Sequence, residues 1–170
     1  MKNQNEPLSY FNELQCSSLH ITTNLGTSII IGLEENNTTW QQISATEITI
    51  QPDKYCITGM AIASQPVGYK GETLTGVEVE FADGRAIAYS CEGDSTTLKD
   101  TIEKEEDASF VSKLTIKETS ENNQPTYICT LTLGINQPIE LTISTADMLI
   151  VGTDGDGLDV VMIEPLQDCA

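Results

Sequence analysis

The chain consists of short β-branched runs separated by turn-forming residues, and this alternation limits the fold more than any other feature. From residue 17 onward, runs rich in Thr, Ile, Val and Leu alternate with Gly, Asn, Asp and Pro. β-Branched residues suit a pleated, half-buried surface, and turn residues at this spacing are typical of sandwiches, barrels and prisms. The sequence therefore predicts an all-β fold.

About eleven segments have this strand-like composition. They are residues 20–23, 28–33, 47–50, 55–63, 73–81, 85–90, 110–118, 126–133, 139–144, 148–151 and 158–164. Only residues 95–107 compete as a helix, but their apolar stripe consists of Leu98 and Ile102 alone. We therefore expect a solvated loop or a short helical turn there.

An internal repeat supports the β assignment. Residues 47–59 and 140–152 share Glu, an aliphatic residue, Thr-Ile, six intervening residues and Ile-x-Gly in one register, and residues 20–32 form a weaker third copy. Downstream, residues 71–80 match residues 155–164 in the same way. The pattern predicts strand, turn, strand and glycine, and it favours a quasi-symmetric assembly about a common core.

A Gly/Asp loop lies between the last two apolar runs. The segment Asp154-Gly-Asp-Gly157 makes poor strand and poor helix, whereas its glycines allow close backbone approach to a ligand. The runs before and after it predict two strands joined by a tight connection. This loop is the candidate small-molecule site.

Composition excludes several partners. The net charge is −18, from 26 acidic and 8 basic residues, and only residues 99–104 and 113–117 bring lysines close together. Nucleic-acid binding needs clustered cations, and this acidity also repels anionic membranes. The charge suits a cation or a basic protein partner, and an oligomer is compatible with it.

The predicted organisation is one domain. Residues 1–16 form an N-terminal polar extension, residues 17–166 the all-β domain, and residues 167–170 a C-terminal tail. No apolar run is long enough to insert into a membrane, and no signal peptide is visible. We therefore expect a cytoplasmic location for the chain as given, since secretion would require a signal removed before residue 1.

These motifs resemble the jacalin-related lectins, whose fold is a β-prism of three four-stranded Greek-key sheets. Gly155-Asp-Gly-Leu-Asp159 matches the Gly-x-x-x-Asp loop of that family, and residues 48–59 and 74–85 resemble its strand patterns. The resemblance implies a single β-prism domain. A β-sandwich is the alternative.

The resemblance also implies carbohydrate binding. The ligand-binding residues would be Gly155, Asp156, Gly157, Leu158 and Asp159, with the Asp159 carboxylate accepting hydrogen bonds from sugar hydroxyls. The first repeat copy carries Thr75 in place of Asp159, so we expect no second site. A glycan is the implied partner, and no cofactor is needed.

Two other functions remain open. Asp154, Asp156 and Asp159 place three carboxylates on one loop, which suits Ca²⁺ but lacks the EF-hand spacing. Alternatively, the chain is an acidic protein-binding module, such as an inhibitor or immunity protein, that contacts a basic partner through residues 92–107.

Catalytic residues are not evident. The single histidine, His20, lies in an expected strand, and no pair of carboxylates stands out among the 26 acidic residues. We therefore predict a protein that is not an enzyme. Cys56 and Cys129 each lie inside an apolar run, and we expect both to be buried thiols.

Overall fold

The fold is described from a computed structural model. It covers residues 17–33, 39–44, 47–51, 56–69, 71–92, 96–104, 109–121, 124–134, 138–145, 147–153 and 157–163. The predicted extension (1–16) and tail (167–170) lie outside these ranges, and the domain limits stay a prediction. In the described part of the chain, no helix is long and apolar enough to cross a membrane.

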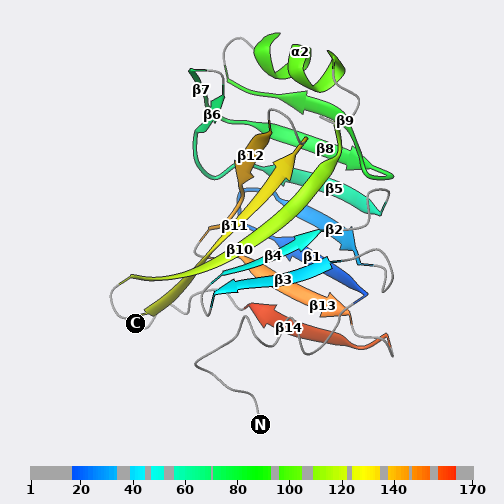
Figure 1. Cartoon of the computed structure of the whole chain (residues 1–170), viewed down its shortest axis with the longest axis vertical. Coiled ribbons are helices and arrows are strands. Elements are labelled where there is room, and N and C mark those ends of the chain that lie inside the picture. Colours follow the sequence, from blue (N-terminus) through cyan, green and yellow to red (C-terminus); the bar gives the residue numbers. More distant parts are fainter. Residues whose placement is uncertain are drawn as a thin grey trace.

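The larger sheet has seven antiparallel strands (Figure 1). They are β1 (Ser18–Thr22), β2 (Ser28–Gly32), β5 (Ile57–Ile62), β8 (Glu78–Ala82), β9 (Arg85–Ser90), β13 (Leu149–Thr153) and β14 (Asp159–Ile163). Their order across the sheet is β14–β13–β1–β2–β5–β8–β9. The predicted connection of the last two runs is confirmed, because β13 and β14 pair with Thr153 opposite Asp159.

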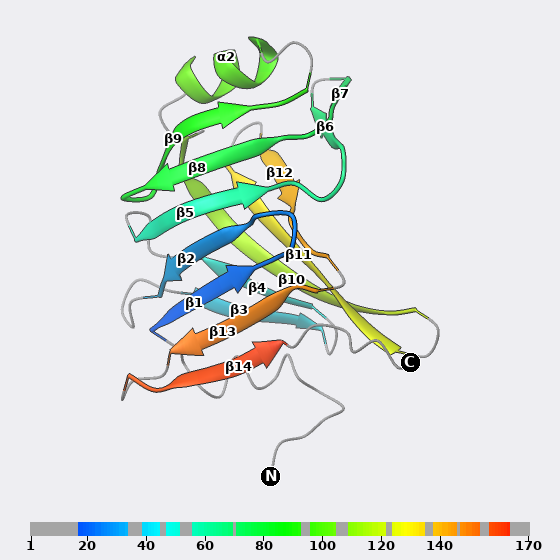
Figure 2. The same cartoon turned by 180° about the vertical axis from the view of Figure 1, so that it is seen from behind.

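The smaller sheet has five strands. They are β3 (Thr39–Ser44), β4 (Glu47–Gln51), β10 (Val111–Glu121), β11 (Gln124–Leu133) and β12 (Ile139–Thr142), in the order β12–β11–β10–β4–β3. The long strands β10 and β11 run obliquely across one face of the larger sheet, as both views show (Figures 1 and 2). A separate pair consists of β6 (Val67–Tyr69) and β7 (Glu72–Leu74).

The core lies between the two larger sheets. Period-2 alternation directs Leu19 and Ile21 of β1 inward from one sheet and Leu114 and Ile116 of β10 inward from the other. All four side chains are fully buried and belong to one hydrophobic cluster. Full burial of such a side chain contributes about 1.5–3 kcal/mol each, so this shared interior holds the sheets together.

The repeat is visible in the structure. In the first two copies the leading strand (β4 or β12) lies in the smaller sheet, and the following strand (β5 or β13) lies in the larger one. The downstream match holds too, because β8 pairs with β5 as β14 pairs with β13. The third copy differs, since β1 and β2 form a hairpin within the larger sheet. The repeat therefore relates two sheet-crossing units.

The predicted loop or short turn after residue 95 is instead a helix, α2 (Thr96–Lys104). Ile102 is 4% exposed and packs into the core, which stabilises a helix that its narrow apolar stripe alone does not predict. Two strands were also missed: β3, in which only Trp40 and Ile43 are apolar, and β6, which has only three residues.

The all-β prediction is confirmed, but the β-prism is not. The described strands form sheets of seven, five and two strands in place of three sheets of four. Two packed antiparallel sheets are closer to the sandwich alternative. Among the cysteines, Cys129 is buried as expected, whereas Cys56, which comes directly before the buried Ile57 of β5, is exposed.

Candidate functional site

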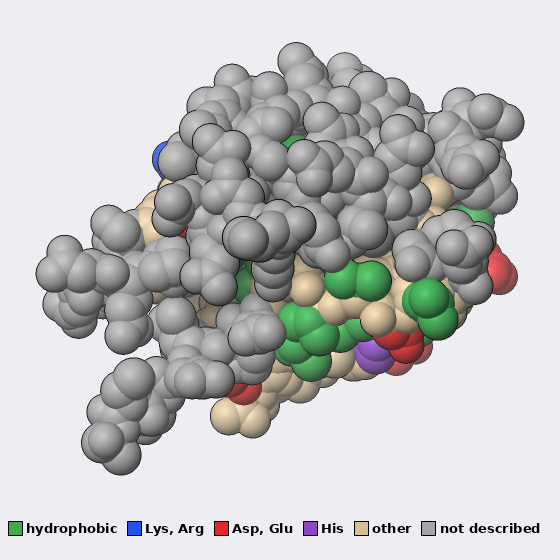
Figure 3. Space-filling model, turned by 90° about the horizontal axis from the view of Figure 1, so that it is seen from below, with side chains coloured by type: hydrophobic (Ala, Val, Ile, Leu, Met, Phe, Trp, Pro, Cys, Tyr) green, Lys and Arg blue, Asp and Glu red, His purple; other side chains and the backbone are tan. Residues whose placement is uncertain are grey.

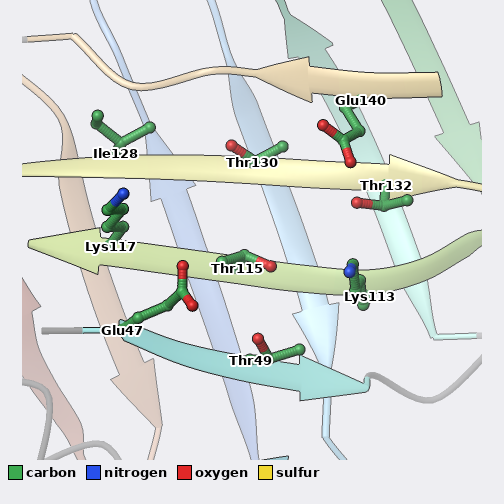
Figure 4. A pocket seen from close by; sticks show the side chains of 9 residues that line it. All are labelled: Glu47, Thr49, Lys113, Thr115, Lys117, Ile128, Thr130, Thr132 and Glu140. Atoms are coloured by element: carbon green, nitrogen blue, oxygen red, sulfur yellow. The ribbon is translucent and has the colours of Figure 1, made fainter. Parts of the chain in front are cut away.

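A polar groove lies on the outer face of the smaller sheet (Figure 4). Its volume is about 360 Å³, and side chains from β4, β10, β11 and β12 line it. The lining is polar except for one isoleucine and consists of Glu47, Thr49, Lys113, Thr115, Lys117, Ile128, Thr130, Thr132 and Glu140.

Strand alternation places these side chains on the outer face. On β10, Leu114 and Ile116 are buried, so Lys113, Thr115 and Lys117 point to the opposite side. The sequence contains the signal as Lys-x-Thr-x-Lys, which is amphipathic at period 2. The sequence alone showed that Lys113 and Lys117 lie close together, but it predicted no function for them.

The repeat builds both flanks of the groove. Glu47 and Glu140 are the first residues of the two copies, and they enter from β4 and β12 respectively. Thr49 pairs with Thr115 on β10, and Thr142 pairs with Thr130 on β11. Thr115 and Thr130 pair with each other. A row of threonines therefore crosses four strands, and the groove is quasi-symmetric about its centre.

The central hairpin breaks this symmetry. Glu47 lies opposite Lys117 on β10, whereas Glu140 lies opposite Thr132 on β11. Lys113 in turn lies opposite Thr132. At one end a carboxylate and an ammonium are therefore direct neighbours, and at the other end a threonine separates them.

The charged side chains of the groove are available to a ligand. Lys113, Lys117 and Glu140 are exposed and Glu47 is half-buried. No hydrogen bond or ion pair engages these four side chains within the described ranges. Thr132, by contrast, is only 4% exposed and forms part of the floor. The groove thus combines two cations, two anions and neutral hydroxyls.

The predicted Gly/Asp loop is only partly described. Asp154, Gly155 and Asp156 lie outside the described residues. Gly157, Leu158 and Asp159 are exposed, and an Asp159 carboxylate oxygen accepts a hydrogen bond of 3.0 Å from Thr153 Oγ1. The equivalent Thr75 hydroxyl donates to Glu92 at 3.2 Å. The loop as a ligand site, and its Ca²⁺ alternative, stay predictions.

His20 lies away from the groove. It sits on β1 of the larger sheet, where its ring is 3.1 Å from Ser28 Oγ and is exposed. Figure 3 shows one face of the molecule from below, with hydrophobic and acidic side chains at the surface of its described part.

The two side chains whose pKa values are raised most also lie outside the groove. Burial raises the pKa of the Cys129 thiol to about 12, which keeps it neutral and unreactive. Burial and the facing Glu118 carboxylate raise the pKa of Tyr127 to about 12. Neither side chain lines the groove, so the pKa values do not mark it as catalytic.

Sequence comparison identifies the family. A model of the thermophilic metalloprotease (M29) family matches residues 1–132. This match covers more than half of the 170 residues, and the chain therefore belongs to the M29 thermophilic metalloprotease family. All groove residues except Glu140 lie inside the matched range.

One similar protein is aminopeptidase PepS of Streptococcus thermophilus. It is 26% identical over 105 residues, which cover 54% of this chain and 25% of PepS. The chain thus spans about a quarter of the length of that relative. The activity of the whole relative does not transfer directly to a chain of this length.

Two solved structures share the fold. AmpT from Thermus thermophilus has a TM-score of 0.78 at 16% identity, covering 97% of this chain and 53% of AmpT. A 2,5-dihydroxypyridine dioxygenase from Pseudomonas putida KT2440 has a TM-score of 0.60 at 9% identity, covering 86% of this chain and 55% of the dioxygenase. Because a dioxygenase shares the fold, the fold alone does not decide the chemistry.

The family corrects several predictions from the sequence. The lectin resemblance, the carbohydrate-binding function and the glycan partner are wrong, and so is the inhibitor or immunity-protein alternative. The prediction of a non-enzyme is contradicted as well, since the family is one of proteolytic enzymes. The lectin motifs were short strand and turn patterns, which recur in unrelated β proteins because turn geometry demands the same residues.

Members of a metalloprotease family use a metal ion, so the prediction that no cofactor is needed conflicts with the family. Within the described residues, no group of three His, Cys, Asp or Glu side chains lies close enough to hold a metal ion. In the groove, Glu47 and Glu140 stand three strands apart, about 14 Å or more, while carboxylate ligands lie about 2.0–2.6 Å from their metal. The described residues do not fit a metal ion.

Proposed function

We propose that the protein acts on peptides as an aminopeptidase of the M29 type and binds them in the groove of the smaller sheet. The observation that carries this proposal is the family match over residues 1–132, which includes almost the whole groove lining. The aminopeptidase name of PepS supports it.

The groove chemistry suits a peptide. An extended peptide offers amide N–H and C=O groups, which the hydroxyls of Thr115 and Thr130 can accept from and donate to. The carboxylates of Glu47 and Glu140 can bind its α-ammonium, and the ammonium groups of Lys113 and Lys117 can bind its α-carboxylate. These side chains bind and orient the peptide, and we assign no step to a metal ion.

The test is release of N-terminal residues from unblocked peptides by the purified full chain. Mass spectrometry would identify the released residue, with zinc, cobalt, manganese or magnesium chloride added in separate reactions. We expect free peptides to be shortened from the N-terminus and N-acetylated peptides of the same sequence to stay intact. The absence of release under all four conditions would overturn the proposal.

A further inference from the structure

The two ends of the groove differ in how far apart their opposite charges stand. Glu47 and Lys117 lie on adjacent strands in direct register, about 5 Å apart at their backbones. Glu140 and Lys113 are both in register with Thr132, so two strand spacings, about 10 Å, separate them. Figure 4 shows the Glu140 carboxylate and the Lys113 ammonium on either side of Thr132.

This spacing leaves room for a ligand at one end only. An extended dipeptide has its charged ends about 6 Å apart, so with a charged hydrogen bond of about 2.7–2.9 Å at each end it spans about 11–12 Å. The long side chains of Lys113 and Glu140 can reach this span from backbones about 10 Å apart, and each further residue would add about 3.3–3.6 Å. At the Glu47 end the two backbones are only about 5 Å apart, which the same dipeptide exceeds by about 6 Å.

The floor of the wider gap is neutral and closed. Thr132 is 4% exposed, and no charged side chain lies between Lys113 and Glu140 in register. A carboxylate and an ammonium that face each other across such a gap match a zwitterion with a short neutral middle. A peptide with blocked ends, or a longer one, cannot satisfy both groups at once.

We propose that the Lys113–Thr132–Glu140 end of the groove is a specificity site for dipeptides with free termini. Lys113 donates to the α-carboxylate, Glu140 accepts from the α-ammonium, and Thr132 forms the floor between them. This inference rests on the proposed peptide-directed function, and it narrows the substrate class from peptides to zwitterionic dipeptides.

Calorimetric titration of the full chain with Ala-Ala, Ala-Ala-amide, N-acetyl-Ala-Ala and penta-alanine tests the site. Ala-Ala should bind most tightly. Lys113→Met should weaken Ala-Ala about tenfold or more but leave Ala-Ala-amide unchanged, because the amide has no carboxylate to lose. Glu140→Gln should weaken Ala-Ala similarly and leave N-acetyl-Ala-Ala unchanged.

Matched controls separate the site from general charge effects. Lys99→Met and Glu78→Gln remove exposed charges of the same sign on α2 and β8, outside the groove. Neither should change Ala-Ala binding. The double variant K113E/E140K keeps the net charge and offers the same two groups in exchanged positions, so it should recover most of the affinity that either single charge reversal loses.

The outcomes distinguish the inference from the function on which it rests. Equal binding of all four peptides, or equal losses for Ala-Ala and its amide in Lys113→Met, would overturn the dipeptide site even if peptides are hydrolysed. Dipeptide binding with the reciprocal pattern but without hydrolysis would support the site and overturn the proposed aminopeptidase activity.

Discussion

The two copies of the repeat build the same backbone but leave different chemistry at the two ends of the groove. Glu47 and Glu140 occupy equivalent positions on β4 and β12, and the strands that follow them cross into the larger sheet in the same way. Glu47 faces Lys117, whereas Glu140 faces Thr132. The charge arrangement at each end is therefore set by the central hairpin, which is not part of the repeat.

The difference shows how a quasi-symmetric frame can hold an asymmetric site. The buried positions of the two copies must satisfy the same packing, so Ile48 and Leu141 are both fully buried. The groove-facing positions of β10 and β11 are free of that demand. They can differ without cost to the core. The quasi-symmetry that relates Thr115 to Thr130 places Ile128 at the position equivalent to Lys113, and Thr132 at the position equivalent to Lys117.

Truncation of the equivalent buried residue in each repeat copy should have the largest effect, and the two effects should be equal. Ile48→Ala and Leu141→Ala each remove a fully buried side chain, and each should lower the free energy of unfolding by about 2–5 kcal/mol. Urea denaturation measures both, with the groove-facing Glu140→Gln as a control that changes stability by less than about 0.5 kcal/mol. A loss at one position only would show that the copies are not equivalent in packing.

Making the two ends alike should have a smaller effect, confined to binding. Thr132→Lys places an ammonium directly opposite Glu140, as Lys117 stands opposite Glu47, and it fills the proposed dipeptide gap. Ala-Ala affinity should fall about tenfold. Ile128→Lys adds the same charge at the other end of the groove and should leave the affinity unchanged. Equal losses in both variants would mean that only the total charge matters.

The smallest effect should be a loss of stability at alkaline pH that arises next to the Glu47 end of the groove. Burial and Glu118 raise the pKa of Tyr127, beside the Glu47 end, from 10.0 to about 12 in the folded state. Below pH 10 this contribution to stability is fully present. Between pH 10 and 12 the unfolded tyrosine loses its proton while the folded one keeps it, so the contribution declines.

Thermal unfolding of Tyr127→Phe and wild type from pH 9 to 12 measures this dependence. The variant should lose less stability over that range, and Glu118→Gln should lie between the two because one cause of the shift remains. Parallel curves for Tyr127→Phe and wild type above pH 10 would contradict the assignment.

Much of the fold could be predicted from the sequence, and the candidate site could not. Period-2 runs predicted most strands, and the shared Glu-x-Thr-Ile pattern predicted two equivalent units, because alternation and turn chemistry are local. The helix α2 was missed because Ile102 is stabilised by tertiary packing that the local pattern does not contain. The ligand site was predicted at residues 155–159 because of their glycines and aspartates, although such residues form turns as readily as they bind ligands.

The amino-acid sequence by itself determined the all-β class, the repeat and the outward direction of Lys113, Thr115 and Lys117, since each depends on neighbours along one strand. Only the tertiary structure decided that Glu140 and Lys113 face one neutral residue while Glu47 and Lys117 face each other. Those relations depend on strand register across the smaller sheet. Register follows from burying both inner faces together, and a one-residue slip would turn every groove side chain toward the core.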